Sequence, residues 1–238
     1  MPKTGKLFLI PTYLSPDNTP DILAPTVQNL IQNIQYYLVE NTRTSRRFIS
    51  SLKLGIKIEA LQFQHLDKNT DPSQIDQLLQ PMIDGIDMGL MSEAGLPAIA
   101  DPGQIAVSRA HQLGINVVPL PGPSSIIQAL IASGFSGQQF TFHGYLPIDK
   151  QKRKSVILQL EREVEKTGYT QLFMETPYRN KSLLDTLTSV LRPGTYLSIA
   201  TGITSKQERI HTATVDQWRK TNSPLEKIPA IFSLGILG

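Results

Sequence analysis

Short apolar runs alternate with longer segments of helical periodicity along the first half of the chain, and this alternation most constrains the fold. Strands separated by helices of this length pair in parallel, with the helices as crossovers. The expected strands are 6–10, 35–39, 58–63, 87–91 and 115–119, and the expected helices are 22–33, 42–52, 73–83 and 103–113. We therefore expect an α/β domain with a mainly parallel sheet, which binds ligands at the carboxyl ends of its strands.

A proline-rich segment separates this half from the next. Residues 119–123 contain three prolines and cannot form a helix or a central strand, so we expect domains 1–118 and 119–238. Beyond it, the expected strands are 139–145, 169–174, 195–200, 208–213 and 229–234, and the expected helices are 150–166 and 179–191. Because the last strands follow one another with little helix between them, we expect a mixed sheet with antiparallel pairs.

Composition excludes several classes of protein. None of the 238 residues is Cys, which rules out disulfides, Cys-ligated metals and a Cys nucleophile. The four histidines lie far apart in the sequence, so there is no local metal motif and we expect no metal. No run of apolar residues is long enough to span a membrane, and residues 1–6 lack the pattern of a signal peptide. We expect a cytoplasmic protein.

Basic residues gather in two places. Residues 43–57 contain five basic residues and no acid, and a second cluster comprises Lys150, Lys152, Arg153 and Lys154. One such run is most often a solvated helix face. Two runs in a chain of net charge +3 favour a polyanionic partner.

Acidic residues follow three of the expected strands. Glu40, Glu93 and Glu175 each come just after a strand, and Arg43 and Arg179 lie in the same segments as the first and last of them. Strand carboxyl ends meet at one edge of an α/β sheet, so these side chains point to one polar cleft. A single carboxylate at such a position is typical of any α/β loop.

Two further segments suit close contact with a ligand. Residues 95–103 are rich in turn formers, which let the backbone approach a bound molecule, although an ordinary βα connection looks the same. Ser124 and Ser125 open an apolar helix, whose free amides attract an anionic group or are simply capped. No G-x-G-x-x-G, Walker loop or G-x-S-x-G motif is present, so the main signatures of dinucleotide enzymes, P-loop ATPases and α/β-hydrolases are missing.

Residues 91–103 and 117–125 together resemble the tetrapyrrole methylase family, whose members are S-adenosylmethionine-dependent methyltransferases. Within it the chain is most similar to members that methylate a cytidine ribose 2′-hydroxyl of small-subunit ribosomal RNA. The segments that carry this closer resemblance are 7–12, 40–44, 142–147, 173–179 and 200–208. The similarity covers nearly the whole chain, from about residue 6 to residue 236.

The resemblance implies a two-domain α/β fold with a cofactor cleft between the domains, a homodimer, S-adenosylmethionine as cofactor and RNA as partner. Carried over by position, the cofactor-binding residues would be Pro11, Glu93, Ala94, Ile99, Ser124, Ser125, Met174, Ala200 and Ala230. Without the resemblance, Ile99, Met174 and Ala200 would be read as core residues.

Five residues are candidates for the acceptor side of the reaction. Glu40 or Glu175 could accept a hydrogen bond from the ribose hydroxyl, as could Glu93, while Arg43 and Arg179 could grip RNA phosphates. The rival interpretation is two structural ion pairs that brace the loops.

Two other functions stay open. The substrate could be a small anionic macrocycle such as a precorrin or porphyrinogen. Asn41 stands where the ribosomal enzymes usually carry Asp, so a cofactor-binding or RNA-binding protein without turnover is also possible.

Overall fold

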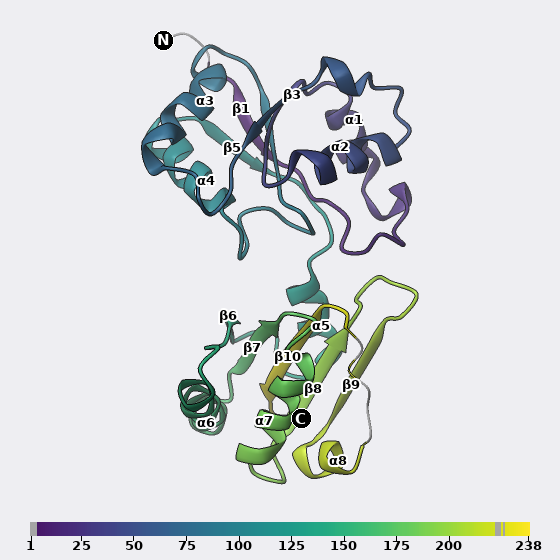
Figure 1. The fold of residues 1–238 in the computed structure, drawn as a ribbon, viewed down its shortest axis with the longest axis vertical. Coiled ribbons are helices and arrows are strands. Elements are labelled where there is room, and N and C mark those ends of the chain that lie inside the picture. The colour runs from purple at the N-terminus through teal and green to yellow at the C-terminus, as the bar shows by residue number, and fades with distance from the viewer. Residues whose placement is uncertain (1–3, 222–224, 226) are drawn as a thin grey trace. The chain divides into compact units, whose positions relative to one another are not determined.

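The computed structural model describes residues 4–221, 225 and 227–238, which form two compact units, Met1–Ser124 and Ser125–Gly238 (Figure 1). The strands of unit 1 are β1 (Lys6–Leu9), β2 (Tyr36–Val39), β3 (Gln62–His65), β4 (Met88–Met91) and β5 (Asn116–Pro119). Its α-helices are α1 (Pro25–Ile31), α2 (Thr42–Ser51), α3 (Ile75–Ile83) and α4 (Gly103–Gln112), and its 3₁₀ turns are η1 (Pro20–Ile22), η2 (Ile58–Ala60) and η3 (Pro72–Gln74).

The sheet of unit 1 is parallel throughout, as predicted. Its strand order is β3-β2-β4-β1-β5, and every neighbouring pair runs in the same direction. The chain moves outward from β1 to β3, returns through β4 and then crosses to β5 on the other side. The carboxyl ends of β1, β2 and β4 therefore meet at the point where the direction of winding changes, which is where such sheets bind ligands.

Two apolar layers hold the helices of unit 1 onto opposite faces of this sheet. On one face α1 and α2 pack through residues such as Val27 and Ile49 against Tyr37 and Ile10. On the other face α3 and α4 pack against Leu7 and the neighbouring strands. Helices thus cover both faces, which explains why β2 and β4 are buried almost along their whole length.

Strand β3 begins later than the sequence pattern predicts. The expected strand 58–63 is instead a 3₁₀ turn over Ile58–Ala60 followed by β3 over Gln62–His65. Ile58 and Leu61 are three residues apart, which is the repeat of a 3₁₀ turn, so the turn brings both against the same core. The alternation that suggested a strand is therefore partly a helical repeat.

Pro119 forms part of β5, which is an edge strand. The Leu120 N–H donates to the carbonyl of Leu9 in β1. The backbone groups of successive strand residues point to opposite edges, so the nitrogen of Pro119 faces the free edge and its lack of N–H removes no bond from the sheet.

Unit 2 contains a mixed sheet with strand order β6-β7-β10-β8-β9. Its strands are β6 (Phe140–Tyr145), β7 (Thr170–Glu175), β8 (Tyr196–Thr201), β9 (Arg209–Thr214) and β10 (Ala230–Gly235), and its helices are α5 (Ser125–Ser133), α6 (Lys150–Thr167), α7 (Asn180–Val190) and α8 (Val215–Lys220). Strands β6 and β7 are parallel, and β10 is antiparallel to both β7 and β8. The mixed sheet confirms the sequence-based expectation.

The core of unit 2 lies between this sheet and three helices. Ile157 of α6, Leu183 of α7 and Trp218 of α8 pack on Phe173 and Phe232 of the central strands. Helix α5 packs on the sheet at β8, β9 and β10. At the edge, the pairing of β6 with β7 shifts between Phe142 and Tyr145, which is a β-bulge. Within the described ranges, no helix is both long and apolar enough to cross a bilayer.

Candidate active site

Three loops meet at the carboxyl edge of the unit 1 sheet. The Thr12 N–H, just beyond β1, donates to the carbonyl of Gly95 at 2.9 Å, and the Glu40 N–H, just beyond β2, donates to the carbonyl of Met91 at 3.3 Å. The Glu93 N–H in turn donates to Oε2 of Glu40 at 3.2 Å. These bonds tie the segments after β1, β2 and β4 to one another, as the sequence pattern predicts for such an edge.

Glu40 has an unusual electrostatic environment. Partial burial raises the pKa of its carboxyl group, and the nearby negative charges of Glu93, Asp101 and Asp67 raise it further. The hydrogen bond from the Glu93 amide opposes these effects. Glu40 is therefore a carboxylate that takes up a proton more readily than an ordinary surface Glu, which is the property a general base needs.

Helix α2 begins at Thr42, two residues after Glu40. The Asn41 side chain accepts from the backbone N–H groups of Arg43 and Thr44, at 3.0 and 3.3 Å, and so caps the helix. Asn serves as well as Asp in this role, so the structure gives Asn41 a capping function. No ion pair between Glu40 and Arg43 is found among the described residues, and Arg43 is exposed.

The loop between β4 and α4 holds its backbone in a strained form. Ala98 and Ala100 have φ angles of 65° and 60°, in the left-handed region that side chains other than Gly disfavour. Asp101, whose pKa is raised by burial, accepts from the Gly103 N–H at 2.6 Å. Such strain persists only where the surrounding fold imposes it, and it often marks a binding loop.

Gly122 packs directly on Pro11. A Cβ atom at Gly122 would lie 2.1 Å from Cβ of Pro11, which is far too close for two carbon atoms that are not bonded. The backbone of the proline-rich segment after β5 therefore packs on the Pro11 ring, two residues beyond β1. Ser124, two residues further on, is largely buried.

We expect Gly122→Ala to lower the thermal midpoint and to disturb this edge. The added methyl group must displace the Pro11 ring, and overpacking of this kind costs about 1–3 kcal/mol. Thermal unfolding measures the effect. Gly137→Ala is the matched control, because a Cβ at Gly137 meets nothing within 4 Å. Equal midpoints for the two variants would contradict the close contact.

In unit 2 the strand register brings three expected residues together. Ile231 of β10 lies opposite both Met174 of β7 and Ala200 of β8. The next residue, Ala230, lies opposite Glu175. Met174, Ala200 and Ala230 thus occupy two adjacent rows at the carboxyl edge of β7 and β8, where Ala200 and Ala230 are buried and Met174 is half-buried.

Glu175 and Arg179 form an ion pair at the same edge. Nε and Nη2 of Arg179 donate to Oε1 of Glu175 at 2.8 and 2.6 Å, and the Thr176 N–H donates to the same oxygen at 2.7 Å. Glu175 is almost fully buried, and its Oε2 finds no hydrogen-bond partner in the described parts of the chain. The structure thus contains one of the two ion pairs that the sequence allows. It also leaves Oε2 of Glu175 as a buried oxygen that can still accept a hydrogen bond.

The structure distributes the sequence-based site residues over the two units. At the carboxyl edge of unit 1 lie Pro11, Glu40, Arg43, Glu93, Ala94, Ile99 and Ser124, and in unit 2 lie Ser125, Met174, Glu175, Arg179, Ala200 and Ala230. Glu93, Ala94 and Ile99 are exposed, so a core function does not account for Ile99. Ala200 is 2% exposed and also contributes to packing. Their roles in binding stay predictions.

Two polar residues at these edges were missed by sequence reasoning. Asp101 could have been found, because an Asp two residues before a helix-opening Gly is typical of an Asx turn. Asn180 could not, because its Nδ2 donates to the carbonyl of Ile228, which is 48 residues away. The Oδ1 atom of Asn180 is buried and, within the described ranges, has no hydrogen-bond partner.

One member of the second basic cluster is not on the surface. Arg153 is 5% exposed, and its Nη2 donates to the hydroxyl oxygens of Ser182 and Thr186, both at 3.3 Å. Arg153 lies on the face of α6 that packs against α7, so it is a buried hydrogen-bond donor. Both interpretations of the cluster, a solvated helix face and a surface that binds a polyanion, are therefore wrong for Arg153.

Comparison with known proteins identifies the class to which this fold and these edges belong. The model of a family described as Tetrapyrrole (Corrin/Porphyrin) Methylases matches residues 20–218. The chain belongs to this family and is a methyltransferase.

Curated relatives agree with the family over most of the chain. The chain is 32% identical to Ribosomal RNA small subunit methyltransferase I of Buchnera aphidicola subsp. Schizaphis graminum, over 89% of this chain and 70% of the relative. The enzymes of the same name from Vibrio cholerae and Escherichia coli O157:H7 are 32% and 30% identical, over 86% and 90% of this chain and 67% and 70% of the relatives.

Solved structures show the same fold. The methyltransferase CobJ superposes with a TM-score of 0.62 at 16% identity, covering 98% of this chain and 94% of CobJ. Uroporphyrin-III-C-methyltransferase from Thermus thermophilus superposes with a TM-score of 0.57 at 16% identity, covering 97% and 92%. This confirms the predicted two-sheet α/β architecture.

Proposed function

We propose that this chain transfers a methyl group from S-adenosylmethionine to a ribose 2′-hydroxyl of small-subunit ribosomal RNA. The observation that carries the proposal is the similarity to enzymes named for methylation of small-subunit ribosomal RNA, which extends over about nine-tenths of the chain. The choice of a hydroxyl acceptor is supported by Glu40, a carboxylate at the unit 1 edge with a raised pKa.

The residues at both edges suit the cofactor. S-adenosylmethionine supplies a methyl group made electrophilic by its positive sulfur, and it carries amino and hydroxyl donors. Buried acceptors that find no partner in the described chain, Oε2 of Glu175 and Oδ1 of Asn180, would satisfy such donors. The residues proposed to bind it are Pro11, Glu93, Ala94, Ile99 and Ser124 of unit 1, and Ser125, Met174, Ala200 and Ala230 of unit 2.

The acceptor is proposed to be handled by charged residues of the same edges. The carboxylate of Glu40 would accept the proton of the ribose hydroxyl, which is otherwise a weak nucleophile. Arg43 is exposed and would hold a phosphate of the RNA. Arg179 already binds Glu175, so its first role is to fix that carboxylate, and Glu175 would then position a donor from substrate or cofactor.

We expect the purified protein to bind S-adenosylmethionine and S-adenosylhomocysteine in the presence of EDTA. The proposed binding groups are backbone amides, carboxylates and small apolar side chains, none of which needs a metal. Calorimetry with each compound measures the affinity. No heat at millimolar cofactor, from protein that unfolds cooperatively, would contradict the proposed cofactor site.

The acceptor is tested by the RNA itself. Mass mapping of ribosomal RNA from a strain that lacks this protein, beside its parent, should show the loss of one ribose methylation. Methyl transfer to a porphyrinogen or precorrin by the purified protein, with ribosomal RNA unchanged in the deleted strain, would replace the RNA proposal with a small anionic macrocycle. Cofactor binding without transfer to either substrate would indicate a binding protein without turnover.

The family resemblance also leads us to propose a homodimer that works in the cytoplasm, where its proposed ribosomal substrate lies. Light scattering of the purified chain measures the assembly state. A monomer that retains full methyl transfer would show that a dimer is not required.

A further inference from the structure

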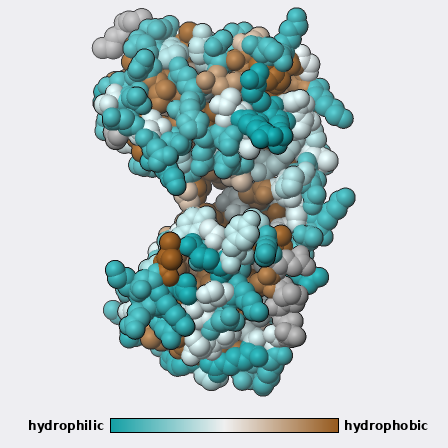
Figure 2. All heavy atoms as spheres, in the orientation of Figure 1, coloured by the Kyte–Doolittle hydropathy of each residue, from teal (hydrophilic) through white to brown (hydrophobic). Residues whose placement is uncertain are grey.

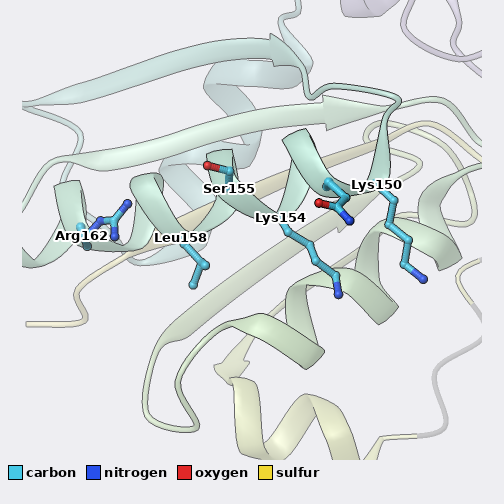
Figure 3. A pocket seen from close by; sticks show the side chains of 6 residues that line it. Lys150, Lys154, Ser155, Leu158 and Arg162 are labelled. Atoms are coloured by element: carbon cyan, nitrogen blue, oxygen red, sulfur yellow. The ribbon is translucent and has the colours of Figure 1, made fainter.

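Helix α6 bears a hollowed surface in unit 2, here named the α6 groove. It has a volume of about 710 Å³ and is lined by Lys150, Gln151, Lys154, Ser155, Leu158 and Arg162. Figure 3 shows Lys150 and Lys154 pointing the same way, with Arg162 further along the helix. The lining contains three cations and no acid.

The acids at this helix, Asp149, Glu161, Glu163 and Glu165, do not line the groove. Glu161 and Glu165 both form ion pairs with Arg192, which follows α7. Asp149 caps α6 by accepting from the backbone N–H groups of Gln151 and Lys152. In the parts of the chain that the structure describes, no ion pair involves a cation of the groove. The lining of the α6 groove is therefore positively charged, with no acid in it and no ion pair to its cations among the described residues.

The arrangement of the cations suits a strand of phosphates. Lys150 and Lys154 are one helical turn apart, and Arg162 lies about 18 Å from Lys150 along the axis, given a rise of about 1.5 Å per residue. Gln151 and Ser155 add neutral hydrogen-bond donors, which commonly contact phosphate and sugar oxygens. Leu158 is 37% exposed and offers an apolar contact for a sugar or base. Much of the visible surface of unit 2 is hydrophilic (Figure 2).

We propose that the α6 groove binds the sugar-phosphate backbone of the RNA substrate at nucleotides away from the one that is methylated. This inference rests on the proposed function and adds a second contact with the RNA, made by residues other than those proposed for catalysis. Because phosphates carry no sequence information, the groove would supply affinity and position while the carboxyl edges select the reacting ribose.

The experiment compares two triple variants that remove the same charge from unit 2. The groove variant is Lys150→Ala with Lys154→Ala and Arg162→Ala. The control is Lys166→Ala with Lys181→Ala and Arg209→Ala, three exposed cations of unit 2 that do not line the groove. Binding of a small-subunit ribosomal RNA transcript is measured between about 50 and 200 mM salt.

The groove variant should bind RNA at least about tenfold more weakly at low salt than wild type. Its plot of log affinity against log salt should be shallower by about 2, since each lost phosphate contact removes slightly less than one from the slope. The control should stay within about threefold of wild type. S-adenosylmethionine affinity and thermal midpoint should match wild type in both variants.

Three other results would overturn the groove, and they differ in what they say about the RNA substrate. Equal losses in the groove variant and the control would overturn the groove and leave the RNA substrate in place. Failure of wild type to bind RNA would overturn the proposed substrate together with the groove. A groove variant that loses binding to poly-glutamate but keeps RNA affinity would overturn the RNA site in favour of an acidic protein partner.

Discussion

Arg179→Ala should lower the thermal midpoint by roughly 4–8 °C. Glu175 is fully buried at its side chain, and Arg179 supplies two of the three hydrogen bonds to its Oε1 atom. Removing the arginine leaves a buried charge without its partner, which costs about 2 kcal/mol or more at a site where the arginine is itself partly exposed. Thermal unfolding followed by circular dichroism measures the shift.

Two further variants separate a structural role from a catalytic one. Arg43→Ala should leave the midpoint unchanged, since Arg43 is exposed, and should lower methyl transfer by about tenfold or more through lost positioning. Adding Glu175→Gln to Arg179→Ala should restore part of the lost midpoint, because the unpaired charge is then gone. Arg179→Ala protein with an unchanged midpoint and reduced transfer would mean that Arg179 acts mainly on substrate.

Glu40→Gln should reduce methyl transfer by about 100-fold or more while making the protein more stable at neutral pH. The loss of rate follows from removing a general base. The gain in stability follows from the raised pKa of Glu40, because a carboxyl group with a raised pKa favours the folded state only when protonated. That contribution is complete below the pKa of the unfolded chain and is lost as pH rises through the folded value.

The test compares the thermal midpoints and methyl-transfer rates of wild type and Glu40→Gln across a range of pH. The midpoint of Glu40→Gln should exceed that of wild type at pH 7–8, and the two should converge as the pH falls below the pKa of an unfolded Glu, about 4.3. The acidic limb of the wild-type rate profile should lie above that value and be absent from the variant. Glu59→Gln, at an exposed carboxylate of unit 1 outside the candidate site, is the control. Full methyl transfer by folded Glu40→Gln would remove Glu40 from catalysis.

Much of the fold could be predicted because local periodicity reports which face of an element is buried. The four crossover helices of unit 1 and the order of its strands and helices follow from such patterns, whereas α8 of unit 2 was not predicted. The start of β3 did not, because Ile58 and Leu61 fit a strand and a 3₁₀ turn equally well in sequence. Only the pairing of Tyr36 with Gln62 decides between them, and that contact is not local.

In the candidate site, too, local features could be predicted from the sequence and contacts between distant residues could not. Glu40 and Glu175 could be placed at strand ends because strand ends are local features. The partner of Glu175 could be predicted, because Arg179 is only four residues ahead in the sequence. The partner of Glu40 could not, because the amide that donates to it is 53 residues away. Arg153 shows the limit most clearly, because only the packing of α7 against α6 makes it a buried donor.

The edges of the two sheets bear on how the chain avoids aggregation. An unpaired strand offers a row of free N–H and C=O groups to which another chain can add. Pro119 removes one such N–H from the outer side of β5, and the bulge between Phe142 and Tyr145 interrupts the regular row along β6. Both features cost the internal pairing little, yet they make edge-to-edge addition of a second chain irregular. Edges that disfavour an added strand lower the risk that newly made copies of the chain aggregate.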